Sequence, residues 1–137
     1  NMKPDILSTA DVDLLIDSFY EKISQIEQMK PYFKKVNWEK HIPIMRGFWY
    51  FTLLNIPDAY KGNVMNPHIH LHQNLPFTKE IFIIWLKVFE EVVRMYFEGP
   101  KAEEAIQIAQ NIGLTMRYKL LGSDHSQSDI TFTIIGN

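Results

Sequence analysis

The sequence contains no cysteine, which excludes disulfide bonds, thiolate metal sites and cysteine nucleophiles. It also has no strong excess of one charge, because 14 Lys and Arg residues face 16 Asp and Glu residues. A net charge of −2 without a clustered basic face argues against nucleic acid as a partner. No apolar run is long enough to span a bilayer, and no secretory signal is evident, so we expect no membrane partner and a cytoplasmic location.

Motifs for nucleotide binding and for serine hydrolase chemistry are also missing. The glycines do not form a phosphate-binding loop, and no nucleophile elbow is present. What the 137 residues do contain is apolar surface: 46% of them are hydrophobic and 13% are aromatic. Chains of this length usually form one domain with a substantial core. The aromatic residues therefore favour a domain that buries large, flat side chains, with room for a flat apolar ligand.

The spacing of apolar residues predicts an all-α fold with four main helices. Ser8 is a candidate N-cap, and Asp11 completes a sequence close to a capping box. Pro43 suggests that the second helix begins close to His41 or is kinked in its first turn. The expected helices cover residues 8–27, 37–54, 78–97 and 100–121, with a short helical turn at 29–33.

The last part of the chain has a different composition from the rest. Residues 124–129 are polar, and residues 130–135 alternate apolar residues with threonine as a strand would. A single strand without a partner does not form a sheet. We therefore expect one domain over residues 2–122 and an extended or disordered tail over residues 123–137.

Three of the five histidines lie at alternate positions, His68, His70 and His72. On a strand all three would point the same way and could bind zinc or another divalent ion. On a helix or turn, one of them could present its imidazole to a heme iron. A third interpretation is a polar loop whose histidines have no special role.

Three hydrogen-bond donors lie on otherwise apolar faces of three different predicted helices. They are Tyr20, His41 and Trp85. Each residue taken alone is more often structural than functional. Together, they would suit an apolar pocket that binds oxygen or another small diatomic ligand.

Short fragments between Leu14 and Leu120 resemble, in order, the group III truncated hemoglobins. The resemblance implies an all-α, truncated two-on-two globin fold that encloses one heme b with its iron. The matching fragments are Phe19-Tyr20-Glu21-Lys22-Ile23, Pro31-x-Phe33, Trp38-x-x-His41, Phe48-Trp49, Leu53-Leu54, Tyr60-x-Gly62-Asn63, Phe82-x-x-Trp85-Leu86 and Phe97-x-Gly99-x-x-Ala102.

The same resemblance assigns roles to individual residues. Tyr20, His41 and Trp85 would line the distal side of the heme. Phe33 would pack against the porphyrin, and Phe48 and Trp49 would help to wall the pocket.

Two histidines compete for the iron. Counting forward from Gly62, the family pattern reaches His68, and counting backward from Trp85, it arrives nearer His72. We prefer His68, because a loop after the ligand tolerates insertion better than the turn that positions it.

The resemblance suggests oxygen, nitric oxide or peroxide as ligands and a reductase as a candidate partner. Strong donors in an apolar pocket should slow oxygen release, which favours scavenging, sensing or redox chemistry over oxygen delivery. The alternative is a non-heme helical protein that binds a divalent metal through His68, His70 and His72. A heme-free globin-like sensor is a third possibility. The oligomeric state and the physiological ligand stay open.

Overall fold

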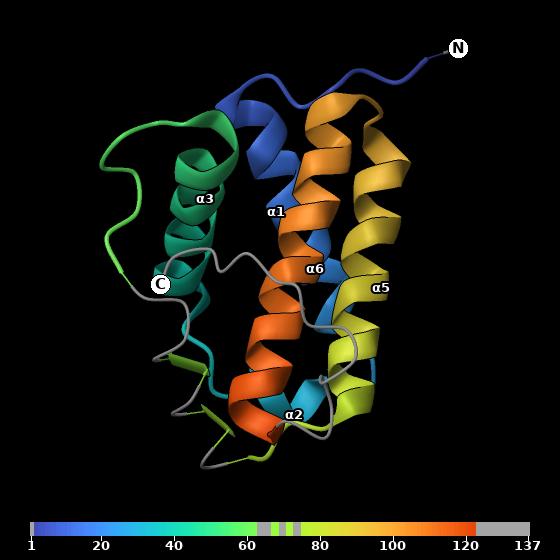
Figure 1. The fold of residues 1–137 in the computed structure, drawn as a ribbon. Helices are drawn as coiled ribbons and strands as arrows, with labels where there is room; N and C mark the ends of the chain where they lie inside the picture. Colours follow the sequence, from blue (N-terminus) through green and yellow to red (C-terminus); the bar gives the residue numbers. More distant parts are fainter. Residues whose placement is uncertain (1, 63–66, 69–70, 73–74, 123–137) are drawn as a thin grey trace.

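The structure is a computed structural model, and it describes residues 2–62, 67–68, 71–72 and 75–122 (Figure 1). None of these residues lies in a β-strand, and the predicted all-α fold is confirmed. The tail at residues 123–137, for which we predicted an extended or disordered chain, lies outside the described residues. The helices with defined bounds are α1 (Thr9–Ile23), α2 (Lys30–Phe33), α3 (Trp38–Leu54), α5 (Lys79–Tyr96) and α6 (Pro100–Leu121).

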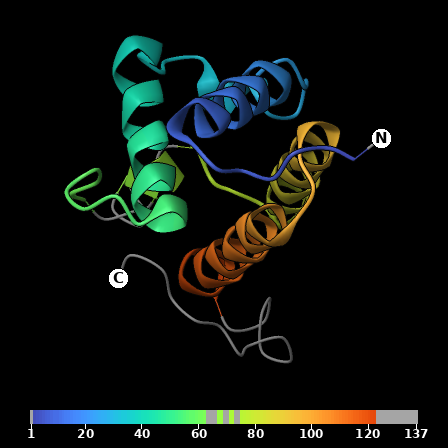
Figure 2. The same cartoon turned by 90° about the horizontal axis from the view of Figure 1, so that it is seen from above.

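The four long helices form two packed pairs, α1 with α3 and α5 with α6 (Figures 1 and 2). Helix α1 also packs against α5, which joins the two pairs. The short helix α2 lies at the end of the molecule that is lowest in Figure 1. This is the two-on-two arrangement that the sequence predicts. Among the helices of the described residues, none is both long enough and apolar enough to cross a membrane.

Polar side chains cap α1 and α5 at residues 8 and 78, where the sequence predicts that these helices begin. The capping box at α1 is present, since Ser8 Oγ accepts the N–H of Asp11 at 3.3 Å and the Asp11 carboxylate accepts the N–H of Ser8 at 3.1 Å. Thr78 Oγ1 similarly caps α5 by accepting the N–H of Ile81 at 3.2 Å. These caps set the start of the helices that carry the candidate site.

Helix α3 begins at Trp38, which agrees with the predicted range 37–54 and not with the alternative start close to His41. Asn37 caps it by accepting the N–H of Lys40 at 3.3 Å. Pro43 lies inside the helix with its ring exposed. A proline here removes one backbone hydrogen bond, a cost that the cap and the buried part of α3 outweigh.

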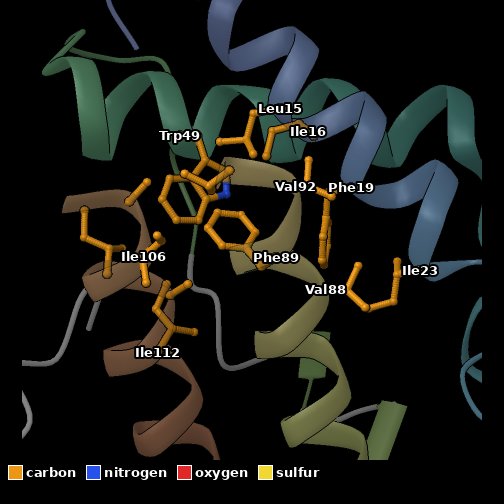
Figure 3. Close-up of a cluster of buried hydrophobic side chains, with 14 of the residues drawn as sticks. Leu15, Ile16, Phe19, Ile23, Trp49, Val88, Phe89, Val92, Ile106 and Ile112 are labelled. Carbon is orange, nitrogen blue, oxygen red and sulfur yellow. The ribbon is translucent and has the colours of Figure 1, made fainter. Parts of the chain in front are cut away.

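The core lies where α1, α3, α5 and α6 meet (Figure 3). Phe19 of α1 and Phe89 of α5 are almost completely buried, with ring centroids 5.4 Å apart. Trp49 of α3 stacks on Phe89 at 5.0 Å with its ring plane inclined by 22°. Aromatic pairs of this geometry add to the free energy gained by burying their area. The four helices are thus held by one continuous aromatic and aliphatic cluster.

Asp5 fastens the N-terminal segment to the start of α6. Its carboxylate accepts the backbone N–H of Lys101 at 2.9 Å and that of Ala102 at 2.8 Å. Asp5 thereby accepts the first N–H groups of α6 in the way an N-cap residue does, although α6 begins more than ninety residues later in the sequence. Gly99 makes the approach possible, because its φ of +136° favours glycine and a Cβ there would lie 2.6 Å from Asp5 Cγ.

Replacing Asp5 with Ala should lower the free energy of unfolding by about 1–2 kcal/mol at neutral pH. Burial alone would raise the pKa of the Asp5 carboxyl, but hydrogen bonds from the backbone of Lys101, Ile6 and Ala102 outweigh burial, so the pKa is lowered. The stabilisation is therefore present above the ordinary carboxyl pKa and is lost as pH falls through the lowered value.

Urea unfolding at about pH 7 and about pH 3 measures both effects. Asp5→Asn is the matched control, since it keeps one acceptor oxygen and cannot titrate. It should retain part of the stability and lose the acid-dependent part. Equal acid sensitivity in the wild type and in Asp5→Asn would contradict this assignment.

Candidate functional site

A largely apolar cavity lies between the C-terminal half of α1, the short helix α2, the start of α3 and the α5–α6 pair. Its volume is about 130 Å³. Segments far apart in the sequence contribute to its wall, so the packing of the two helix pairs creates it. Its lining residues are Tyr20, Met29, Tyr32, Phe33, Val36, His41, His68, Leu71, Phe77, Ile81, Phe82, Trp85, Gly113 and Met116.

The three predicted hydrogen-bond donors all line this cavity. Tyr20 comes from α1, His41 from α3 and Trp85 from α5. The rings of Tyr20 and His41 are 5.2 Å apart between centroids. Phe19 lies behind both Tyr20 and Trp85, with its centroid 4.9 Å from the first and 6.1 Å from the second. The buried Phe19 thus supports two of the three donors from the core side.

The cavity changes the protonation chemistry of two of these donors. Burial raises the pKa of the Tyr20 phenol, so the hydroxyl keeps its proton and can donate it in a hydrogen bond. Burial lowers the pKa of His41, and the nearby imidazole of His68 lowers that pKa further. His41 is therefore neutral at pH 7, with one N–H donor and one acceptor nitrogen.

The two histidines that compete as iron ligands have different surroundings. Both His68 and His72 are in helical conformation. His68 lines the cavity, whereas His72 does not. His72 Nδ1 instead accepts the backbone N–H of Phe77 at 2.8 Å, which places the proton of a neutral His72 on Nε2. His72 thus has a structural partner at the start of the segment that leads into α5.

The geometry expected for a three-histidine metal site is not found at the described positions. His68 and His72 are helical rather than extended, and only His68 reaches the cavity. His70 lies outside the described residues. Among the residues that the structure does describe, no three His, Asp or Glu side chains are grouped as metal ligands would be.

Comparison with known proteins identifies the family. No family model matches the chain. A group 3 truncated hemoglobin of Campylobacter jejuni subsp. jejuni is 30% identical over 117 residues, which cover 81% of this chain and 89% of that protein. The chain belongs to the group III truncated hemoglobins. The crystal structure of the group III truncated hemoglobin from Campylobacter jejuni agrees, with a TM-score of 0.76 and 29% identity over 87% of this chain and 95% of the other.

Not every residue expected at the pocket of this truncated hemoglobin lines the cavity. Phe33 does, but Phe48 and Trp49 do not. Both are buried in the core, where Phe48 packs edge-on against Trp49 and against Tyr60 at 5.2 Å. Trp49 stacks on Phe89. Their place is the junction of α3 with α5 and with the chain that follows α3.

Some lining residues of this globin were not singled out from the sequence. Most are ordinary apolar residues, such as Phe77 and Met116, which carry no signal of their own. Gly113 did carry one, because a glycine within a helical pattern often marks close packing. In the structure Gly113 faces the cavity, and a Cβ there would lie 3.1 Å from Leu86 Cδ1.

The chemistry of the wall fits a heme. The lining is mostly apolar and aromatic, and His68 supplies an imidazole of the kind that usually ligates heme iron. The cavity is smaller than the usual cofactor site of about 300–1,000 Å³. A porphyrin therefore fits only if side chains of the wall move outward.

Proposed function

We propose that this truncated hemoglobin binds one heme b through His68 and that it takes oxygen or another small diatomic ligand, such as nitric oxide. One observation carries the proposal: His68 lines the same apolar cavity as Tyr20, His41 and Trp85. The heme, when bound, supplies an iron that can bind a diatomic ligand. The protein supplies the coordinating imidazole, the apolar wall and the hydrogen-bond donors.

The three donors determine how the protein would treat its ligand. The Tyr20 hydroxyl and the Trp85 indole N–H donate hydrogen bonds toward a diatomic ligand in the cavity, and the neutral His41 adds a further N–H. Hydrogen bonds are stronger in a pocket that excludes water. Ligand release is therefore slow, which favours scavenging, sensing or redox chemistry. Redox chemistry requires a source of electrons, so a reductase is the partner we propose.

Titration of the heme-free protein with hemin tests the proposal. We expect a Soret band that saturates at about one hemin per chain. Because hemin binds the folded state alone, the free energy of unfolding should also rise by about 2.7 kcal/mol when the free hemin concentration is about a hundred times the dissociation constant. The ferrous form should then show spectral shifts with carbon monoxide and oxygen.

Two other outcomes would favour the competing functions. A helical protein that takes up no hemin would favour a heme-free sensor. Stoichiometric zinc binding that is lost in His70→Ala, with no hemin uptake, would favour the divalent metal site of His68, His70 and His72.

A further inference from the structure

Trp38, the first residue of α3, contacts the cavity wall from outside. Its ring centroid is 5.6 Å from that of Tyr20 and 5.8 Å from that of His41, and both of these residues line the cavity. It also stacks on Phe33, a third lining residue, at 5.6 Å with an angle of 25° between the rings. These distances are typical of aromatic rings in direct contact. Trp38 is thus separated from the cavity by a single layer of rings.

The other side of Trp38 is open to solvent. Trp38 is half-buried, and it lines two grooves on the surface of the protein. One groove also contains Lys30 and Lys34, and the other contains Asp17 and Arg46. A small molecule in either groove can therefore touch the indole ring.

The other two tryptophans are placed differently: Trp85 is half-buried like Trp38 but lines neither groove, and Trp49 is buried. Trp85 lines the cavity, but its ring stacks on Phe89 at 6.2 Å, and Phe89 stacks on Trp49 at 5.0 Å. Phe89 is 1% exposed and Trp49 is 5% exposed. From Trp85 this row of rings therefore leads to Phe89 and Trp49 inside the core (Figure 3), and not to either groove.

We propose that Trp38 is an electron relay between the cavity and a small reductant at the protein surface. The proposal rests on the function proposed above, since heme is the group that would react with the oxidant. Indole is among the side chains that lose one electron most readily, and it can do so while it keeps its N–H proton. Trp38 would give an electron inward across Tyr20 and Phe33 and would recover one from a reductant in a groove.

With hydrogen peroxide as the oxidant and ascorbate as the reductant, the reaction balances. One peroxide takes up two electrons and two protons and becomes two molecules of water, with cleavage of the O–O bond. Two ascorbate anions each lose one electron and one proton and become ascorbyl radical anions. The two electrons pass through Trp38 one at a time, and the indole is unchanged at the end.

The first experiment maps where oxidation occurs in the hemin-loaded protein. Peroxide is added in stoichiometric amount without a reductant, and the peptides are analysed by mass spectrometry. Trp38 should be the most oxidised tryptophan, and ascorbate present during the reaction should protect it. Oxidation of Trp85 or Trp49 with an intact Trp38 would overturn the relay.

The second experiment compares Trp38→Phe with Trp38→Tyr. Phenylalanine keeps an aromatic ring against Tyr20 but is not readily oxidised, so ascorbate oxidation by peroxide should slow by about tenfold or more, which corresponds to about 1.4 kcal/mol of barrier. Tyrosine can be oxidised and should restore part of the rate. In Trp38→Phe without ascorbate, oxidation should shift to Tyr20 and Trp85.

The failure of the relay and the failure of the proposed function give different results. Absence of a Soret band in the wild type would mean that the proposed function is wrong. If all three proteins bind hemin with the same Soret band and oxidise ascorbate at the same rate, the relay is wrong and the heme function stands. Oxidation mapping uses the wild type alone, so it decides the matter even if both variants fail to fold.

Discussion

Replacing His68 with Ala is expected to remove the imidazole that we propose as the ligand of the heme iron in this truncated hemoglobin. His68 lines the cavity. Of the other described residues at positions 67–72, only Leu71 also lines it, and Leu71 has no atom that could ligate iron. The hemin dissociation constant should rise by about a hundredfold or more, equivalent to roughly 2.7 kcal/mol. Ferric and ferrous absorption spectra should report the lost nitrogen ligand, and added imidazole should restore them.

His72→Ala is the matched control for this prediction. It removes an imidazole four positions away, but one that accepts the N–H of Phe77 instead of facing the cavity. The variant should lose about 1 kcal/mol of stability and keep the wild-type heme spectrum. If instead His72→Ala changed the axial ligation while His68→Ala preserved it, the ligand would be His72. If neither variant changed it, both assignments would be wrong.

The long helices could be predicted from the sequence because their signals are local. Apolar residues repeat with helical spacing, and the caps Ser8 and Thr78 lie beside the helices that they begin. The sequence allows α3 to start at residue 37 or close to His41, because Pro43 is an unfavourable residue whose cost packing elsewhere in the helix can outweigh. Local signals therefore predict which helices exist better than they predict where each begins.

The site could be predicted only in part, for a related reason. Tyr20, His41 and Trp85 stand out as polar groups on apolar faces, and they do line one cavity. Phe48 and Trp49 are apolar residues on a broad apolar stripe, and the stripe alone does not determine which side faces the cavity. That depends on how α3 is rotated against α1 and α5, which long-range contacts such as that between Trp49 and Phe89 determine.

The choice between His68 and His72 likewise depends on a contact that counting residues cannot reveal. The family pattern reaches either residue, depending on the direction of counting. The hydrogen bond from Phe77 to His72 and the place of His68 on the cavity wall are the observations that favour His68. The capping of α6 by Asp5 is equally hidden, because its partners Lys101 and Ala102 are at the other end of the sequence.

Gly47→Ala is expected to be the most destabilising of the glycine substitutions within the helices. Gly47 is buried in α3. The helix ends at Asn55, where the chain turns back, and the loop that follows brings Ala59 against Gly47. A Cβ at Gly47 would lie 2.4 Å from the carbonyl oxygen of Ala59. The obstacle is backbone, so it cannot rotate away as a side chain could, and the loop must shift. The net loss should be about 2–3 kcal/mol, despite a gain of about 1 kcal/mol in helix propensity.

Gly113→Ala is the control, because it offers the same gain in propensity without a backbone obstacle. Its Cβ would lie 3.1 Å from Cδ1 of Leu86, a flexible side chain that can move by a few tenths of an ångström. Its effect on stability should be within about 1 kcal/mol of zero, as measured by urea unfolding of the heme-free protein. Equal effects of the two substitutions would show that Ala59 moves freely. If the Ala59 carbonyl resists displacement, Gly47→Ala should also weaken hemin uptake, because the loop that contains Ala59 comes shortly before His68 in the sequence.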